Sequence, residues 1–300
     1  MLDPIVAVAG LLVGFIVGLT GMGGGALMTP ILVLLFGIDP LTAVSSDIVA
    51  SMVMKPVGGA VHWKRGTVHR PLVLWLMLGS VPSAFLGVLL LRSFGNGAAL
   101  QILVKHALGV ALLVVVAGLL LRPLLQRGRG HAEGAADLVV RPFPTLLIGV
   151  VGGLVVGVTS VGSGSLMIIM LLLLYPRIRL KELVGTDLVQ AIPLVASAAL
   201  GHLLFGDFKL SLTGSILLGS IPGVFLGAML SSRAPDYVIR PSLVVVLLAS
   251  GLKLLGVSTG LVSVVGGATA IAGVVYAVSQ RQSLQRQSAA PSLVSSARPS

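Results

Sequence analysis

The most constraining feature of the sequence is a series of long apolar stretches that contain no charged residue. Residues 5–38, for example, include no Lys, Arg, Asp or Glu. A helix that spans a bilayer needs about 20 mostly apolar residues, and the sequence offers about seven or eight such stretches. Charged residues make up 10% of the chain, whereas soluble domains carry roughly 25%. The sequence therefore predicts an all-α, polytopic integral membrane protein.

The composition also excludes several functional classes. The chain has no cysteine, nine carboxylates and five histidines, so we expect no thiolate metal site, no cofactor and no enzymatic activity. The net charge of +11 comes from short Lys and Arg clusters between the apolar stretches. Such clusters are typical of cytoplasmic loops that face anionic membrane lipid, and we expect no nucleic acid partner.

The chain consists of two related halves. Gly10, Gly14, Gly18 and Thr20 recur 139 positions later as Gly149, Gly153, Gly157 and Thr159, and Asp47 and His62 recur 140 positions later as Asp187 and His202. Apolar low complexity does not keep Asp, His and Thr in one register, so we infer an internal duplication. The predicted organisation is a first membrane repeat (1–122), a basic cytoplasmic linker (123–143), a second repeat (144–256), an extra transmembrane helix (257–279) and a disordered cytoplasmic tail (280–300).

The first apolar stretch of each repeat is too long for a single crossing. A helix over residues 5–37 would be about 50 Å long, against a bilayer core of about 30 Å. Four glycines in Thr20-Gly21-Met22-Gly23-Gly24-Gly25, near its middle, strongly disfavour a continuous helix. We therefore predict two short helices joined by an unwound turn, here and again at residues 159–165.

The distribution of Lys and Arg predicts how these broken segments cross the membrane. If every segment crosses once, the loop charges divide 9 against 9, which contradicts the preference of Lys and Arg for the cytoplasmic side. If each broken segment returns to the side from which it entered, the split becomes 15 to 3, and the three are Arg92, Lys209 and Lys253. The repeats then have inverted topology in a bacterial inner membrane, with the N-terminus outside and the C-terminus cytoplasmic.

Glycine breaks at matching positions of inverted repeats are typical of the substrate site of a secondary transporter. An unwound turn frees backbone N–H groups, and the following half-helix directs its positive N-terminal end at the site, so that an anion can bind. The predicted substrate-binding residues are Thr20, Gly21, Met22, Gly23, Gly24, Gly25, Thr159, Ser160, Gly162, Ser163, Gly164, Ser165 and Lys55. The alternative is close helix packing, which we favour for the glycines spaced by four, such as Gly10, Gly14 and Gly18.

The second segment of each repeat carries ionisable residues, which are rare within membrane spans and mark transport pathways. Asp47, Ser51, Lys55 and His62 share one helix face, but Val195 stands at the position equivalent to Lys55, so any site is asymmetric. We assign coupling or gating, with a proton as the candidate coupling ion, to Ser46, Asp47, Asp187, Gln190, His62 and His202. Capping or an interfacial position is the alternative for the Asp and His residues.

Several motifs together point to a family. They are Gly18-Leu19-Thr20-Gly21-Met22-Gly23-Gly24-Gly25, Ser46-Asp47, His62 with Gly66, Gly79-Ser80-Val81-Pro82 and Thr159-Ser160-Val161-Gly162-Ser163-Gly164. Over about residues 5–256 the chain resembles the sulfite exporter TauE/SafE family of membrane permeases. The resemblance implies a small anionic substrate such as sulfite, an organosulfonate or a related sulfur-containing or carboxylate anion.

We expect transport by alternating access, and a homo-oligomer is compatible with the sequence. Two alternatives remain open, an anion channel of the same fold and an intramembrane enzyme. Saturable uptake with counterflow would favour the transporter over the channel, and an enzyme would need a catalytic constellation at a membrane face.

The charge split makes a topology prediction. Reporters fused after Arg127 and after Arg281 should both be cytoplasmic, and a tag at Met1 should be accessible from outside. The measurement is the activity of compartment-specific reporters in intact cells. A cytoplasmic N-terminus would contradict both the returning segments and the inverted repeats.

Overall fold

The computed structural model describes residues 2–20, 24–64, 68–95, 97–126, 139–176, 178, 180–230 and 236–289. All regular secondary structure in these residues is α-helical, as predicted. The helices are α1 (Pro4–Thr20), α2 (Gly25–Leu34), α3 (Pro40–Lys64), α4 (Arg70–Ser93), α5 (Ala98–Gln126), α6 (Pro142–Thr159), α7 (Leu166–Leu174), α8 (Leu180–Phe205), α9 (Leu210–Leu230), α10 (Asp236–Leu254) and α11 (Thr259–Ala289). Six of them, α4, α5, α6, α8, α9 and α11, contain stretches long and apolar enough to span a membrane. The fold is that of a polytopic membrane protein.

Both predicted helix breaks are present. The first apolar stretch divides into α1, with 17 residues, and α2, with 10 residues. Its counterpart divides into α6, with 18 residues, and α7, with 9 residues. At 1.5 Å per residue, α2 and α7 are each about 15 Å long or less, roughly half of a bilayer core.

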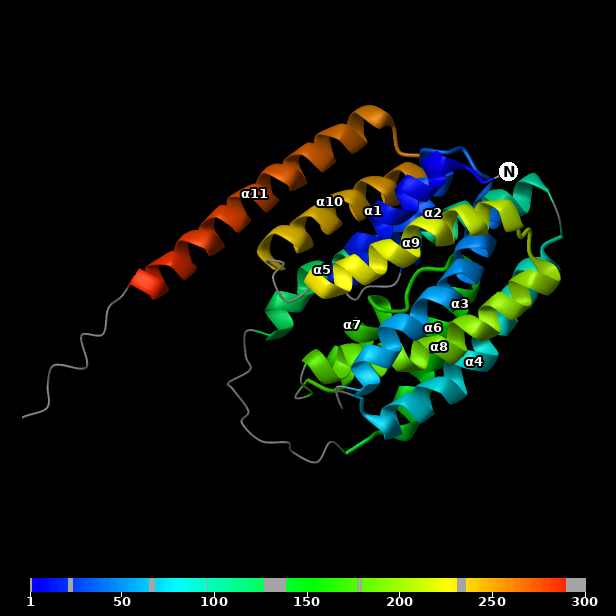
Figure 1. Cartoon of the computed structure of the whole chain (residues 1–300), viewed down its shortest axis with the longest axis horizontal. Helices are drawn as coiled ribbons and strands as arrows, with labels where there is room; N and C mark the ends of the chain where they lie inside the picture. Colours follow the sequence, from blue (N-terminus) through cyan, green and yellow to red (C-terminus); the bar gives the residue numbers. More distant parts are fainter. Residues whose placement is uncertain are drawn as a thin grey trace, which may run out of the picture.

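The C-terminal helix is longer than the sequence predicted. We expected a span at 257–279 followed by disorder from residue 280, but α11 continues to Ala289. The added segment contains Gln, Arg, Leu and Ala, which favour helix, and no Gly or Pro. Residues 290–300 of the predicted tail lie outside the described residues. α11 packs along α10 at the edge of the bundle (Figure 1).

α6 and α7 form a hairpin whose two open ends meet. The Tyr175 hydroxyl, one residue after α7, accepts a hydrogen bond of 2.8 Å from the backbone N–H of Arg141, directly before α6. The same hydroxyl lies 2.6 Å from that of Thr145. The chain therefore returns, after α7, to the end of the bundle from which α6 began.

The starts of α1 and α3 also lie at one end of the bundle, because both contact the first turns of α9. The backbone N–H of Asp3 donates to the Ser215 hydroxyl at 2.8 Å. The Thr213 hydroxyl donates to the Ser46 carbonyl, in the second turn of α3, at 3.2 Å. The α1–α2 pair thus enters and leaves at the same end, as α6–α7 does.

The first helix of each repeat packs against a helix of the other repeat. α1 packs on α9 of the other repeat, and α6 packs in the equivalent way on α4 (Figure 1). Glycines make these contacts close, because a Cβ at Gly14 would lie 2.5 Å from the Ser220 carbonyl oxygen and one at Gly10 would lie 2.8 Å from that of Ile216. The packing interpretation of the glycines spaced by four is therefore confirmed.

α3 and α8, which occupy equivalent places in the two repeats, run antiparallel. The Ser46 hydroxyl near the start of α3 accepts from the backbone N–H of Lys209, after the end of α8, at 3.4 Å. The Thr186 hydroxyl near the start of α8 accepts from the backbone N–H of His69, after the end of α3, at 3.0 Å. Antiparallel equivalent helices are what inverted repeats require; the inverted orientation in a membrane stays a prediction.

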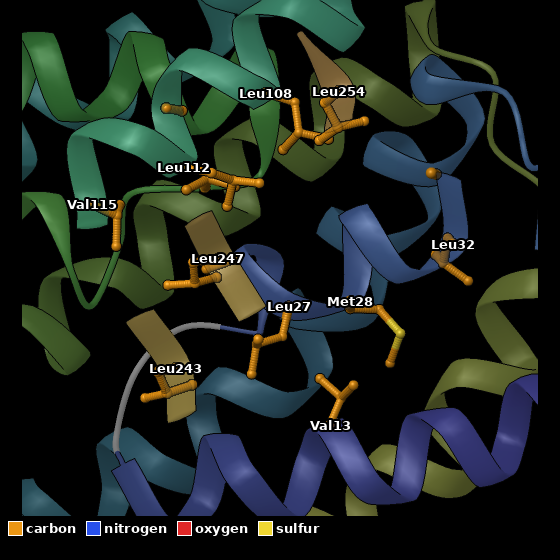
Figure 2. Packing of buried hydrophobic residues seen from close by; sticks show 14 of the residues in the cluster. Val13, Leu27, Met28, Leu32, Leu108, Leu112, Val115, Leu243, Leu247 and Leu254 are labelled. Atoms are coloured by element: carbon orange, nitrogen blue, oxygen red, sulfur yellow. The ribbon is translucent and has the colours of Figure 1, made fainter. Parts of the chain in front are cut away.

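A large apolar core surrounds the short helix α2. Leu27, Met28 and Leu32 of α2 belong to a buried apolar cluster that also includes residues of α5 and α10 (Figure 2). The other labelled members of this cluster are Val13 from α1, Leu108, Leu112 and Val115 from α5, and Leu243, Leu247 and Leu254 from α10. Seven of the ten residues of α2 are buried. Protein, rather than lipid, thus covers the helix that follows the first break.

Two glycines in different environments test this packing. Gly14→Leu should lower the free energy of unfolding by about 1–3 kcal/mol or more, because the side chain must enter the α1–α9 contact. Gly266→Leu in α11 is the matched control, since no heavy atom lies within 4 Å of a Cβ at that position. The measurement is thermal unfolding of both variants in detergent. Equal melting temperatures would contradict the close α1–α9 contact.

Candidate functional site

The two helix breaks meet inside the bundle. Gly25, at the start of α2, packs so closely on Ser160, after α6, that a Cβ on Gly25 would overlap the Ser160 carbonyl oxygen. The second break is sharply bent, because Ser160, Gly162 and Gly164 all have positive φ angles of 61°, 131° and 96°. The predicted residues Gly21, Met22 and Gly23 lie outside the described residues. The breaks of both repeats nevertheless converge through Gly24, Gly25 and residues 159–165.

Asp47 of α3 joins the two breaks. Its Oδ2 atom accepts hydrogen bonds from the Thr29 hydroxyl of α2 at 2.9 Å and from the Ser160 hydroxyl at 2.7 Å. The side chain is fully buried, and its Oδ1 atom has no hydrogen-bond partner in the part of the chain that the structure describes. Thr29 was not among the predicted site residues, although a hydroxyl in an apolar helix, at the position where the other repeat has Ile168, was a usable signal.

Lys55, two turns further along α3, reaches the second break. Its Nζ atom donates to the Ser163 hydroxyl at 2.6 Å, and the residue is 9% exposed. Asp187 and, more weakly, Asp47 attract this ammonium group. Lys55 is therefore a buried cation that is hydrogen-bonded to the second break and attracted by two buried carboxylates.

Asp187 of α8 has different partners from Asp47. The Gln190 side-chain nitrogen donates to its Oδ1 atom at 3.0 Å, and the backbone amide of Gly164, just before α7, faces its carboxylate. The Gln190 oxygen in turn accepts from the Ser80 hydroxyl of α4 at 3.2 Å. Ser80 was part of a recognised motif, but spacing gave no indication that it contacts the site.

The repeat correspondence explains this asymmetry. The positions equivalent to Thr29 and Ser160 around Asp187 hold Ile168 and Gly21, so Asp187 has no such hydroxyl donors. The positions equivalent to Lys55, Ser163 and Gln190 hold Val195, Gly24 and Ala50. The two repeats therefore differ at several positions of the site, and not only at Lys55 and Val195. Asp47 is surrounded by hydroxyls, whereas Asp187 lies with a cation, an amide side chain and a helix start.

The hydroxyls of Thr20 and Thr159 bond to the backbone of their own helices. Thr20 donates to the Ile16 carbonyl at 2.9 Å, and Thr159 donates to that of Val155 at 2.6 Å while accepting from the Val161 N–H at 3.1 Å. Ser165 is buried directly before α7. Of the hydroxyls in the second break, Ser160 and Ser163 are the ones that contact ionisable side chains of α3.

The described hydrogen bonds of Ser46 and His202 involve backbone and hydroxyl groups rather than Asp47, Lys55 or Asp187. The Nε2 atom of His202 lies 2.8 Å from the Gly157 carbonyl oxygen, and its Nδ1 atom lies 2.8 Å from the Ser45 hydroxyl. A carbonyl only accepts, so Nε2 carries the proton and Nδ1 accepts from Ser45. Together with a hydrogen bond from Thr42 to Asp207, these contacts join α3, α6 and α8. The His62 side chain lies outside the described residues.

No group of three or more His, Cys, Asp or Glu side chains among the described residues could hold a metal ion. What converges instead is one Lys, two Asp residues and several hydroxyls at two breaks in apolar helices. Ionisable groups buried within spans, at breaks placed equivalently in two repeats, are characteristic of membrane transporters. The fold and this cluster define that class of protein.

The chain belongs to the sulfite exporter TauE/SafE family, whose model matches residues 6–254. It is 41% identical over 248 residues to "Probable membrane transporter protein YjnA" of Bacillus subtilis (strain 168), covering 82% of this chain and 97% of the relative. It is 25% identical over 246 residues to YdhB of the same organism, covering 81% and 96%. A probable membrane transporter protein of Xylella fastidiosa (strain 9a5c) is 28% identical over 233 residues, covering 75% and 83%.

No solved structure matches the chain. The family that the sequence motifs indicated is confirmed, and the family and its curated relatives make this chain a membrane transporter. α11, which begins at Thr259, lies beyond the region that the family model matches.

Adjacent glycines at the first break provide a test of the contact between the two breaks. Gly25→Ala should reduce transport strongly, because the added methyl group must separate the start of α2 from Ser160. Gly24→Ala should be tolerated, since a Cβ there would lie 3.4 Å from the Met54 methyl group. The measurement is transport in proteoliposomes at matched protein levels. Equal rates for the two variants would show that the contact has no functional role.

Proposed function

We propose that this chain is a secondary transporter that moves a small oxyanion across the bacterial inner membrane by alternating access. The substrate class is sulfite, an organosulfonate or a related sulfur-containing or carboxylate anion. The N-terminus is outside and the C-terminus is cytoplasmic. The observation that carries the proposal is the contact of a buried cation, Lys55, with Ser163 at a break immediately before a half-helix.

The chemistry at this contact suits an anion. The Lys55 ammonium and the Ser163 hydroxyl are donors, and the start of α7 adds backbone N–H groups and a partial positive charge. A Lys in the middle of a membrane helix costs about 2.5–3.5 kcal/mol, so a counter-charge is favourable. The Asp187 carboxylate, which attracts the Lys55 ammonium group, would supply that charge, and an entering oxyanion would compete with it for the same group.

The bundle also provides a basis for alternating access. Interlocking glycines join α1 firmly to α9 and α4 to α6, so each pair can move as one body. The site residues come from α3, α8 and the two breaks, which lie between these pairs. Rocking of the pairs about a central site would expose Lys55 to one side and then to the other.

Charge distribution supports the proposed orientation. Arg70 and Arg141 stand directly at the starts of α4 and α6, which are parallel neighbours. Arg92 stands at the other end of α4, where its guanidinium lies 4.7 Å from the ring centre of Phe205, the last residue of α8. More basic residues therefore lie at the end of the bundle where α4 and α6 begin than at the opposite end. If the linker before α6 is cytoplasmic, this distribution follows the positive-inside rule.

Lys55→Met tests the anion site. The variant should raise the half-saturation concentration of the oxyanion by about 10- to 100-fold, because a charge-assisted hydrogen bond contributes about 1.5–3 kcal/mol. Labelled sulfite and a labelled organosulfonate should be compared in proteoliposomes, with counterflow to distinguish a carrier from a channel. Lys105→Met, on the half-buried Lys of α5, is the matched control.

A second variant separates binding from folding. Lys55→Met leaves Asp187 without its counter-charge, so the double variant Lys55→Met/Asp187→Asn should recover thermal stability while anion affinity stays low. Wild-type half-saturation in Lys55→Met would contradict the proposed site. Transport without counterflow would favour the channel.

A further inference from the structure

Asp47 is a buried carboxylate that the proposed anion site does not use. We propose that it is the binding site of a coupling cation, a proton or Na⁺, separate from the anion site at Lys55. The inference rests on the proposed function, because a coupling cation has a role only if an anion is moved. It identifies where the second charge of the transport cycle binds.

The first observation is the unequal use of the two carboxylate oxygens. Oδ2 accepts from Thr29 and Ser160, whereas Oδ1 is buried without a hydrogen-bond partner among the described residues; Asp187 likewise has one such oxygen, Oδ2. A buried carboxylate oxygen without a partner is costly. A proton on the carboxylate or a cation beside Oδ1 would remove that cost, and the neighbouring hydroxyl oxygens keep lone pairs that can bind a hard cation.

The second observation is the direction of the neighbouring helix. Ser160, which bonds Asp47, is the C-terminal capping residue of α6, and its backbone N–H bonds the Val156 carbonyl. The C-terminal end of a helix carries a partial negative charge, which repels a carboxylate and attracts a cation. The start of α2 also packs on Ser160, so the end of one helix and the start of another meet beside Asp47. Asp187 instead faces the Gly164 amide before the start of α7, with no helix C-terminus among its described hydrogen-bond partners.

The third observation is the distribution of charge. Lys55 is on the same helix, but it lies eight residues further along α3, a rise of about 12 Å, and its Nζ atom donates to Ser163. α2 and the second break face Asp47 with the hydroxyls of Thr29 and Ser160. No cationic side chain among the described residues hydrogen-bonds Asp47, so a bound cation would balance its charge.

The repeat comparison predicts one such site rather than two. Asp187 has no counterpart of the Thr29 and Ser160 hydroxyls, because the equivalent positions in the sequence hold Ile168 and Gly21. It therefore lacks the hydroxyl oxygens that a second cation would need. One coupling cation per cycle is the expected stoichiometry at this pair of breaks.

The test measures how oxyanion uptake by wild-type proteoliposomes responds to an imposed gradient. One set of vesicles has a Na⁺ gradient at equal pH, a second has a pH gradient without Na⁺, and a third has neither. One of the two gradients should stimulate wild-type uptake several-fold and so identify the cation. In Asp47→Asn the ratio of uptake with and without that gradient should fall to about one.

Hydroxyl variants give a graded second readout. Thr29→Ala and Ser160→Ala should each raise the cation concentration or proton activity needed for half-stimulation by about two- to tenfold, as expected for losing one hydrogen bond or ligand. Ser197→Ala is the matched control, because the Ser197 hydroxyl of α8 donates to the Val81 carbonyl instead of to the site. Its half-stimulation should equal that of the wild type.

A binding measurement keeps the proposal testable even if a variant transports poorly. Thermal stability in detergent should rise with the identified cation in wild type and in Ser197→Ala, but not in Asp47→Asn. If wild type shows counterflow but neither gradient stimulates uptake, or if Asp47→Asn keeps the full response, the cation site is wrong and the oxyanion transporter stands. Absence of oxyanion counterflow in wild type would overturn the proposed function itself.

Discussion

The structure depends on enclosing unwound backbone within the hydrocarbon region of a membrane. A free N–H or C=O group facing lipid costs several kcal/mol, so a broken helix is stable there only when protein surrounds the break. Here each break packs on the other, and Gly25 allows the α2 backbone to approach Ser160 directly. The core of α2, α5 and α10 then covers the outside of the first break. The internal duplication matters for this reason, since one repeat alone would leave its break without a partner.

Once the breaks are paired, the duplicated sequence no longer needs to be symmetric. The glycine contacts between α1 and α9 are matched by those between α4 and α6, and the bonds of Ser46 and Thr186 are matched as well. The side chains at the breaks, by contrast, have diverged in nearly every polar position. The contacts that hold the bundle together are alike in the two repeats, and so are Asp47 and Asp187, whereas most polar groups around these two aspartates differ. That division separates a structural framework from a functional centre on physical grounds.

The sequence was sufficient for most of the helices and for the two breaks, because apolar length and clustered glycines act locally. It also indicated Lys55, Asp47 and Asp187, since ionisable residues within spans are conspicuous. The partners of these residues could not be predicted, because Thr29, Ser160 and Ser80 reach them from helices distant in the chain. Ser46 and His202 were assigned to coupling or gating as polar residues of the second segment of each repeat; their hydrogen bonds join neighbouring parts of the bundle, and their role in coupling stays a prediction. The continuation of α11 to Ala289 shows that a polar composition does not by itself end a helix.

The placement of the two aspartates on α3 and α8 makes the compensation of their charges depend on how these two helices pack together. α3 and α8 are antiparallel, so residues at equivalent positions lie at opposite depths, and Lys55 on α3 comes closer in depth to Asp187 than to Asp47. A single Lys can therefore compensate one carboxylate well and the other poorly. Any motion that changes the contact of α3 with α8 changes how Lys55 is shared between the two aspartates. Because a buried charge is tolerated only when it is paired, occupancy of the site by ions and the relative position of these two helices must depend on each other.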